Sequence, residues 1–377
     1  MAGRFGRPGT AMSSAGVRAT SRALGALAGI ALASGVGSAH VEYLEDEEAG
    51  VDPWFVVEAL SDPFAAALVG GSGLLVLVAA LAALRFRPFE RDVAVFRSAI
   101  REYADLLPWL LRLGFGLPMV GAGFTGYYFN PIATPVLVGD PIARLLQILV
   151  GFLLLFGLAT RAAALFGLAV YLASVPARPG LLVSFEYVPG FLAIAVLGPG
   201  RPSADQVLAR MAAAEGTVYG EIDPVQRLAV GTRRYLAPYE AIVPTVVRIG
   251  TGLTFVGLGV GEKLLRPEPA LATVDRYDLT SVVPLAPELW VLGAGLTEAA
   301  LGLALLVGAF TRASALVAIG VFTLTLFALP DDPVLAHIGL FSLASALLIT
   351  GGGPYSLDRY LGATDDPVPT VRGHEPV

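Results

Sequence analysis

Long apolar runs separated by short polar segments dominate the pattern along the chain. An α-helix needs roughly 20 apolar residues to cross a bilayer, and nine runs approach that length. They lie at 65–84, 108–127, 143–160, 162–176, 181–198, 241–264, 287–309, 313–329 and 334–350. The short alternating segments of a membrane β-barrel are not the dominant pattern. The chain is therefore predicted to be an all-α, polytopic integral membrane protein.

The N-terminus has the pattern of a secretory signal. Arginines precede a short apolar run at 23–36, and Gly-Ser-Ala follows before His40. This order of charged, apolar and small residues is typical of a signal peptide. We predict either a cleaved signal peptide over 1–39 or an uncleaved signal anchor. The acidic segment 40–64 is then external, and 65–91 holds the first membrane-spanning helix and its loop.

Residues 92–107 have the hydrophobic periodicity of an amphipathic helix, not the uniform apolarity of a membrane span. One face is apolar (Val93, Phe96, Ile100, Tyr103, Leu107), and the other is charged (Asp92, Arg97, Arg101, Asp105). Such a helix lies along a membrane surface instead of crossing it. We predict an interfacial helix that leads directly into the second span.

The remaining spans are predicted to be two copies of one unit. Ten residues between Tyr103 and Pro131 recur between Tyr239 and Pro267 at an offset of 136 residues. At an offset of 151 residues, 149–165 resembles 300–316. Each copy holds four spans, and an even number returns the chain to its starting side. We expect two tandem, parallel-oriented four-helix bundles plus one extra N-terminal transmembrane helix. The predicted segments are 92–210 for the first copy, 211–240 for a cytoplasmic connector, 241–362 for the second copy and 363–377 for a flexible tail.

Arginines concentrate in the loops on one side of these spans, which by the positive-inside rule is the cytoplasmic side. They are Arg85, Arg87, Arg91, Arg161, Arg201, Arg210, Arg227, Arg233, Arg234 and Arg312. The expected location is the cell membrane, with the mature N-terminus outside and the C-terminus in the cytoplasm.

Composition narrows the chemistry. The 377 residues are 55% hydrophobic and 15% charged, the net charge is −6, and cysteine is absent. This excludes thiol catalysis, disulfides and iron–sulfur ligation within the chain. Of three histidines only His337 lies in an apolar span, so a bis-histidine haem is excluded and no metal site is predicted. No basic stripe suggests nucleic acid. A redox role would therefore use a diffusible quinone, not a covalently bound cofactor, or a cofactor on a partner subunit.

The glycine-rich run from Arg248 to Leu265 contains the first candidate site residues. Gly252 and Gly259 share one side of the helix with Arg248 and Lys263, whereas a second strip holds Gly250, Gly257 and Gly261. We expect these glycines to serve close helix packing. A nucleotide-binding loop would require a preceding strand.

Glu298 is predicted to lie near mid-membrane, where a carboxylate is costly unless it is paired or protonated. Two interpretations are open. In the structural one, Arg248 pairs with Glu298 and fixes the bundle, while Lys263, the only lysine, extends to the surface. In the functional one, Arg248, Lys263, Glu298 and His337 line a polar cavity for a quinone head group or for protons. The first copy has Gln147 and Tyr127 in place of Glu298 and Lys263. Glu186 is a further buried-acid candidate, beside a local helix break.

The runs "RIGTGLTFVGLGVGEKLL", "LTEAALGLALLVGAFTRASAL" and "GGGPYSLDRYL" resemble the DoxX family of four-helix membrane proteins. The resemblance covers the second copy well and the first as a divergent duplicate. The resemblance implies that the family's motif residues in this chain are Arg248, Lys263, Glu298, Arg312 and Ser356-Leu357-Asp358.

The resemblance implies a membrane subunit near quinone chemistry, of the thiosulfate:quinone or quinol oxidase type, with partner redox subunits. It names no catalytic residue. The alternatives are a non-enzymatic scaffold or assembly factor and, ranked last, a small-solute transporter.

Overall fold

The computed structural model describes residues 50–130, 140–222 and 225–361. The chain divides into a unit of residues 1–40 and a unit of residues 41–377, and every described residue belongs to the second. The expected signal segment 1–39, His40, His374 and the tail 363–377 lie outside the described residues.

The described residues form helices and no β-strand, with one isolated bridge between Tyr128 and Asn130. Five helical stretches are long and apolar enough to cross a membrane: Pro63–Phe86, Glu90–Thr125, Leu228–Leu264, Pro287–Val307 and Thr311–Ala328. Four shorter apolar helices are Pro141–Phe156, Thr160–Ser174, Tyr187–Leu197 and Val334–Thr350. Together they occupy the nine predicted spans, and the all-α polytopic membrane fold is confirmed.

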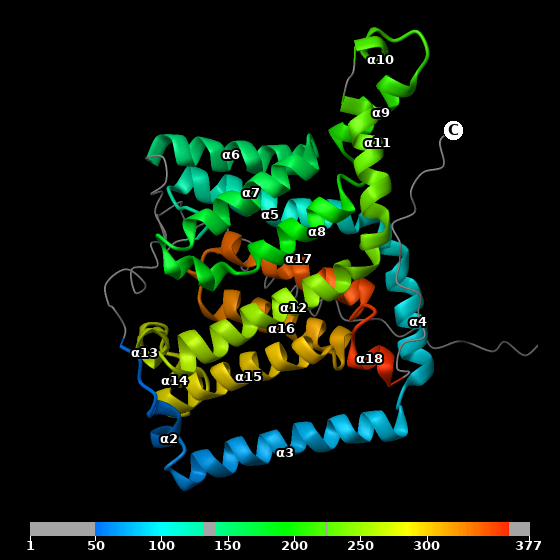
Figure 1. Ribbon diagram of the computed structural model, residues 1–377. Coiled ribbons are helices and arrows are strands. Elements are labelled where there is room, and N and C mark those ends of the chain that lie inside the picture. The colour runs from blue at the N-terminus through cyan, green and yellow to red at the C-terminus, as the bar shows by residue number, and fades with distance from the viewer. Residues whose placement is uncertain (1–49, 131–139, 223–224, 362–377) are drawn as a thin grey trace, which may run out of the picture. The chain divides into compact units, whose positions relative to one another are not determined.

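The first group of helices contains α5 (Leu107–Thr125), α6 (Asp140–Phe156), α7 (Thr160–Ser174) and α8 (Tyr187–Leu197). A 3₁₀ turn, η3 (Pro179–Ser184), precedes α8. Within the group, α5 packs on α6 and α8, and α7 packs on the same two helices (Figure 1).

The second group contains α12 (Val243–Val256), α15 (Pro287–Val307), α16 (Thr311–Ala328) and α17 (Val334–Thr350). The last turns of its first span form a π-helix, η5 (Gly257–Leu264). Helix α15 packs on α12 and η5, and α17 packs on α12 and α16.

The two groups meet along α5, α17, α12 and α8, with α5 packed on α17 and α12 packed on α8. Gly114 of α5 faces Ser342 of α17 and Gly121 faces Leu335, so these two helices are antiparallel. Helix α12 is also antiparallel to α17, because Arg248 near its start contacts Gly352 beyond the end of α17. Helices α5 and α12 therefore run in the same direction, as the even number of spans per unit predicts.

Some of the predicted glycine contacts hold the second group together. A Cβ on Gly252 would lie 2.9 Å from the carbonyl oxygen of Gly302, and one on Gly259 would lie 2.6 Å from that of Gly295. The prediction was wrong for Gly257 and Gly261, where a Cβ would have nothing within 4 Å. Both residues lie in the π-helix, on the side that meets no neighbouring helix among the described residues.

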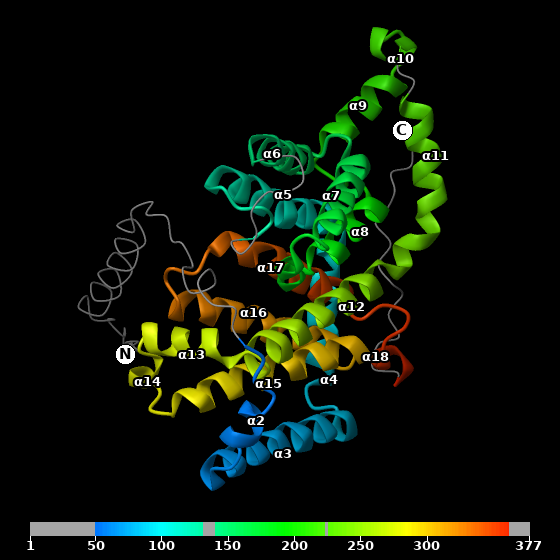
Figure 2. The same cartoon turned by 60° about the vertical axis from the view of Figure 1, so that its left-hand side comes forward.

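Each group begins with an amphipathic helix that runs across the membrane-spanning helices (Figures 1 and 2). Before α5 these are α4 (Glu90–Arg101) and the 3₁₀ turn η2 (Glu102–Leu106). Before α12 these are α11 (Val225–Leu236) and η4 (Ala237–Ile242). The predicted interfacial helix at 92–107 thus matches α4 and η2. A short pair, α9 (Ala204–Ala213) and α10 (Val218–Ile222), precedes α11.

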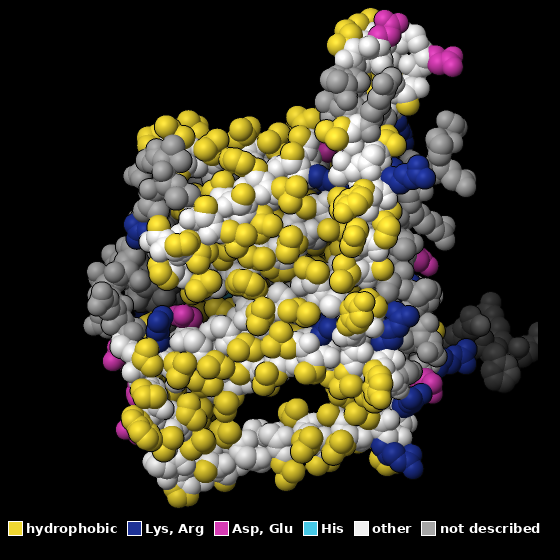
Figure 3. All heavy atoms as spheres, viewed as in Figure 1, with side chains coloured by type: hydrophobic (Ala, Val, Ile, Leu, Met, Phe, Trp, Pro, Cys, Tyr) yellow, Lys and Arg dark blue, Asp and Glu magenta, His cyan; other side chains and the backbone are white. Residues whose placement is uncertain are grey.

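Segments outside the two groups include the exposed span α3 (Pro63–Phe86), of whose residues only Ala65 is buried. Hydrophobic side chains also cover the visible face of the spans (Figure 3). The short helix α2 (Phe55–Ala59) places Phe55 in a small cluster with Val274 of α13 (Pro267–Arg276) and Val291 of α15. Helices α14 (Leu279–Val282) and α18 (Leu357–Tyr360) complete the described elements.

Candidate functional site

Arg248 is almost fully buried near the start of α12, where it binds carbonyl oxygens and not Glu298. Its Nε donates to Gly352 O at 3.0 Å, its Nη1 donates to Leu305 O and Leu306 O, and its Nη2 donates to Tyr355 O at 2.9 Å. The expected Arg248–Glu298 pair is therefore wrong. Carbonyls in the last turn of a helix lack intrahelical partners and carry partial negative charge, so the end of α15 satisfies a guanidinium well.

Arg112 in α5 makes the same kind of contacts in the first group. Its Nε donates to Leu154 O at 2.8 Å and its Nη2 to Leu155 O at 3.0 Å, while its Nη1 donates to Pro199 O and Pro202 O. These acceptors stand where Leu305, Leu306, Gly352 and Tyr355 stand in the second group. An arginine with four carbonyl acceptors closes the same end of both groups.

Two further motif residues complete this end of the second group. Asp358 accepts hydrogen bonds from the backbone N–H groups of Phe310 and Thr311 at 2.7 and 2.8 Å, which caps the start of α16. Arg312 donates to Leu348 O and Ile349 O in the last turn of α17. Arg248, Arg312 and Asp358 therefore connect helix ends, which is a structural role.

The opposite end of the second group contains an ion pair within the spans. Lys263 Nζ lies 2.7 Å from Glu298 Oε2, and the two side chains are 25% and 15% exposed. The structural interpretation expected Lys263 to extend to the surface. This expectation was wrong, because Lys263 pairs with Glu298. The pair neutralises a carboxylate that would be costly alone in an apolar core, and it remains partly accessible.

A second acid–base pair lies at the start of α17. His337 Nε2 is 3.5 Å from Asp332 Oδ2, and each side chain is 16% exposed. Burial raises the pKa of the Asp332 carboxyl above its usual range, while the positive charges of His337 and Lys263 oppose that shift. The positive charge of Lys263 acts on the Asp332 carboxyl, so we treat the two pairs together. We call Lys263, Glu298, Asp332 and His337 the polar cluster.

The local backbone explains how Lys263 reaches Glu298. Gly259 brings η5 against α15, so closely that a Cβ on Gly259 would lie 3.0 Å from Glu298 Cβ. The π-helix adds a residue to the turn, which changes the direction of the side chains that follow, and such segments are frequent at functional sites. Gly295 provides space on the facing helix for Leu264. Close approach of two helices and an altered turn therefore set the geometry of the ion pair.

The first group has a neutral network at the equivalent position. Gln147 Nε2 donates to Met119 O and Tyr127 O, and its Oε1 accepts from Phe129 N. All three bonds are internal to the group, and a neutral amide stands where the second group has the acid Glu298.

Comparison with family models finds a match, which lies within the second group. Residues 243–331 match the family model DoxX. The chain contains a DoxX domain. No curated protein and no solved structure matches the chain.

The DoxX match contains both halves of the Lys263–Glu298 pair and stops at Asp331, one residue before Asp332. Of the four predicted site residues, the structure pairs Lys263 with Glu298, pairs His337 with Asp332, and places Arg248 at the other end of the DoxX domain. Sequence reasoning missed Asp332. Its position five residues before the single intramembrane histidine was the available signal.

Glu186 lies at the junction of the two groups. Its side chain is buried, Oε2 has no hydrogen-bond partner among the described residues, and a Cβ on Gly339 of α17 would be 3.7 Å from its Cγ. It stands between η3 and α8, so the expected buried acid and local helix break are both confirmed.

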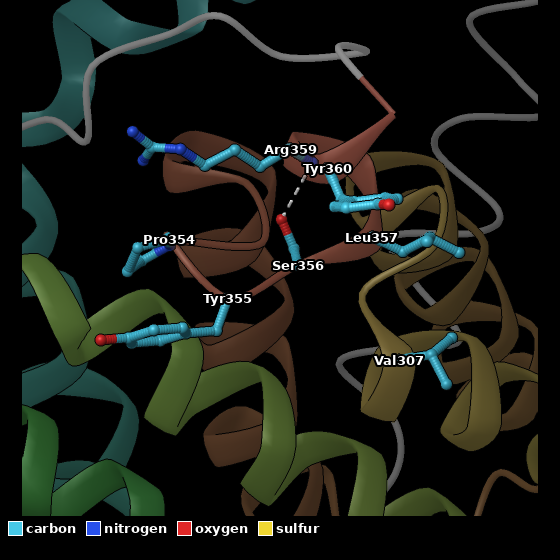
Figure 4. Close-up of a pocket in the computed structure, with 7 residues that line it drawn as sticks. All are labelled: Val307, Pro354, Tyr355, Ser356, Leu357, Arg359 and Tyr360. Carbon is cyan, nitrogen blue, oxygen red and sulfur yellow. Dashed lines mark hydrogen bonds between the residues drawn. The ribbon is translucent and has the colours of Figure 1, made fainter.

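A wide hollow of about 610 Å³ adjoins α18, beyond the Arg248 end of the DoxX domain. Figure 4 shows Tyr355 and Arg359 extending away from Leu357 and Val307, and Ser356 accepting a hydrogen bond from Arg359 N. Ser356 Oγ also donates to Gly353 O, so this serine orders the turn that supplies carbonyls to Arg248. The hollow therefore lies beside the turn whose carbonyl oxygens accept from Arg248.

Proposed function

We propose that this DoxX-domain protein is a membrane subunit of a quinone-linked electron-transfer system, and that the polar cluster binds the quinone head group. The observation that supports this proposal is the partly accessible Lys263–Glu298 pair within the membrane-spanning helices, next to Asp332 and His337. A structural pair alone would need no second pair beside it.

The donors and acceptors of the polar cluster fit a quinone. The Lys263 ammonium has three N–H donors and uses one on Glu298, which leaves donors for a carbonyl oxygen. Glu298 and His337 can accept a proton from a hydroxyl group of the reduced form. A quinone, when bound, would supply the two-electron redox chemistry that a chain without cysteine lacks. Lys263 would orient the head group, and Asp332 would orient the His337 ring.

The test uses the full-length protein with any partners, purified from native membranes. Glu298→Gln and Lys263→Met should each lower the quinone content per chain and quinone-dependent turnover, by about tenfold for loss of a charge-assisted hydrogen bond. Thr297→Val is the matched control, because Thr297 is the exposed neighbour of Glu298 on α15. Quinone content and turnover equal to wild type in both cluster variants, with the fold intact, would contradict the proposal.

A non-enzymatic scaffold or assembly factor is the second candidate. The exposure of α3 supports it, because a span with only one buried residue leaves a full surface for another membrane helix. This candidate expects a partner that is lost when exposed leucines of α3 such as Leu75 are replaced, and no effect of Glu298→Gln. Cross-linking in native membranes, followed by mass spectrometry, distinguishes the two.

We also propose that the chain is a tandem duplicate with cytoplasmic arginine-bearing ends, an external polar cluster and an N-terminal signal. The matching contacts of Arg112 and Arg248 support the duplication. The arginines at the ends of the helices support the orientation through the positive-inside rule.

A further inference from the structure

The first group encloses a cavity that the polar cluster does not involve. Its volume is about 140 Å³, and it lies between α5, α6 and α7. Met119, Val150 and Gly167 form its buried wall. An engineered apolar cavity of about 150 Å³ stays dry and admits a benzene-sized guest, so this volume suits a small hydrocarbon group.

The mouth of the cavity faces the surroundings of the protein between α6 and α7. Phe166 is 46% exposed at this mouth, and Leu146 and Val170 are half-buried there. The neighbouring residues Leu145 and Leu165 are exposed and apolar. In a bilayer such a surface contacts lipid, so the cavity opens toward hydrocarbon.

The polar atoms of the wall are already engaged. Gln147 has three hydrogen bonds to backbone groups, and the Tyr128 hydroxyl pairs with Ser174 Oγ at 2.9 Å. A buried water needs two to four polar partners, and a quinone head group needs hydrogen-bond donors. The wall provides neither, and the expected guest is purely apolar.

The second group has larger residues at the equivalent positions. Phe255 stands for Met119, Leu301 for Val150 and Ala318 for Gly167, at the offsets found in the sequence. The Phe255 ring stacks on Phe322 with centroids 5.3 Å apart. These larger side chains fill space in the second group that is open in the first.

We propose that this cavity binds the end of a lipid acyl chain that enters between α6 and α7. The chain end supplies the contacts that Phe255, Leu301 and Ala318 supply in the second group, and it stabilises a packing that would otherwise contain a void. This inference stands apart from the proposed quinone function.

The experiment uses full-length protein in phosphatidylcholine vesicles that contain a lipid with a diazirine at the end of one acyl chain. After irradiation, labelled residues are mapped by mass spectrometry. Label on Met119 and Val150 supports the proposal, because both side chains are buried and only a guest in the cavity reaches them. Label on Phe166 without label on these two overturns it.

Two sets of variants test whether the label reports the cavity. Met119→Phe with Val150→Leu fills the wall with the residues of the second group and should lower wall labelling by about tenfold. Leu146→Trp should block the mouth with the same effect, even if the filled variant does not fold. Leu145→Trp, on the adjacent exposed position, should leave labelling unchanged. Undiminished labelling in the filled or blocked variants, when folded, overturns the proposal. Labelling of the wall by an isoprenoid diazirine but not by the acyl probe also overturns it.

Discussion

At the scale of single residues, the charged side chains of the DoxX domain have two different tasks. Arg248 is satisfied by four carbonyl oxygens and is almost fully buried, so its charge is used within the fold. Lys263 pairs with one carboxylate and keeps part of its surface accessible. A guanidinium suits several carbonyls in a fixed geometry, whereas a compact ammonium leaves donors for a ligand.

Asp332 gives a prediction for pH dependence. Its pKa is raised by burial, so the stability that it contributes is present below the ordinary aspartate pKa and is lost as pH rises through the folded value. Asp332→Asn should therefore gain stability relative to wild type as pH rises above about 4, the ordinary carboxyl pKa. The midpoint of thermal unfolding in detergent is the measurement.

Asp331→Asn is the control for this prediction. Asp331 is the neighbour of Asp332 in the chain, and its side chain is 57% exposed. The difference in unfolding midpoint between Asp331→Asn and wild type should not increase with pH. A difference between Asp332→Asn and wild type that does not change with pH would show that burial of this carboxyl has no consequence for stability.

At the scale of elements, the first span of the DoxX domain changes from α-helix to π-helix at Gly257. The α-helical part approaches α15 through Gly252, and the π-helical part approaches it through Gly259. Glycines in this span therefore have unequal roles, because Gly252 and Gly259 face α15 whereas Gly257 meets open space.

Gly252→Ala and Gly257→Ala form a matched pair of substitutions on this span. The first places a methyl group 2.9 Å from a carbonyl oxygen and should destabilise the protein by about 1–3 kcal/mol through overpacking. The second meets open space and should be neutral or stabilising by up to about 1 kcal/mol, since alanine lowers the entropy of the unfolded chain. Reversible unfolding in mixed micelles measures both. Equal destabilisation by the two changes would contradict the described packing.

At the scale of the whole molecule, the two helix groups run in the same direction and contact each other through their first and fourth spans. Each starts with an amphipathic helix that lies across the spans (Figure 1). The ends that carry Arg112, Arg161, Arg248 and Arg312 therefore share one side, and the polar cluster lies on the other.

The absence of cysteine allows a direct test of orientation. Ser61→Cys follows α2, and Glu215→Cys lies between α9 and α10; both positions are exposed. A membrane-impermeant maleimide added to intact cells should label Ser61→Cys, and it should label Glu215→Cys only after permeabilisation. The reverse labelling pattern would place the polar cluster at the cytoplasmic side of the membrane.

Hydrophobic periodicity in the sequence determined the spans and their class, because a membrane imposes length and apolarity on every crossing segment. It also identified the interfacial helix before α5, since that segment alternates with a charged face. The internal similarity further predicted two groups that run in one direction. These are local or additive properties, so they can be read from the order of residues.

The partners of buried charges were decided only by the tertiary structure. The structural interpretation of the sequence paired Glu298 with Arg248 and not with Lys263, because rise per residue gives height and not direction. The π-helix turned Lys263 toward Glu298, while the ends of α15 and α17 supplied carbonyls to Arg248. Asp332 pairs with His337 across the first turn of α17. Such contacts depend on where separate elements meet in space, and that is fixed by packing of the whole chain.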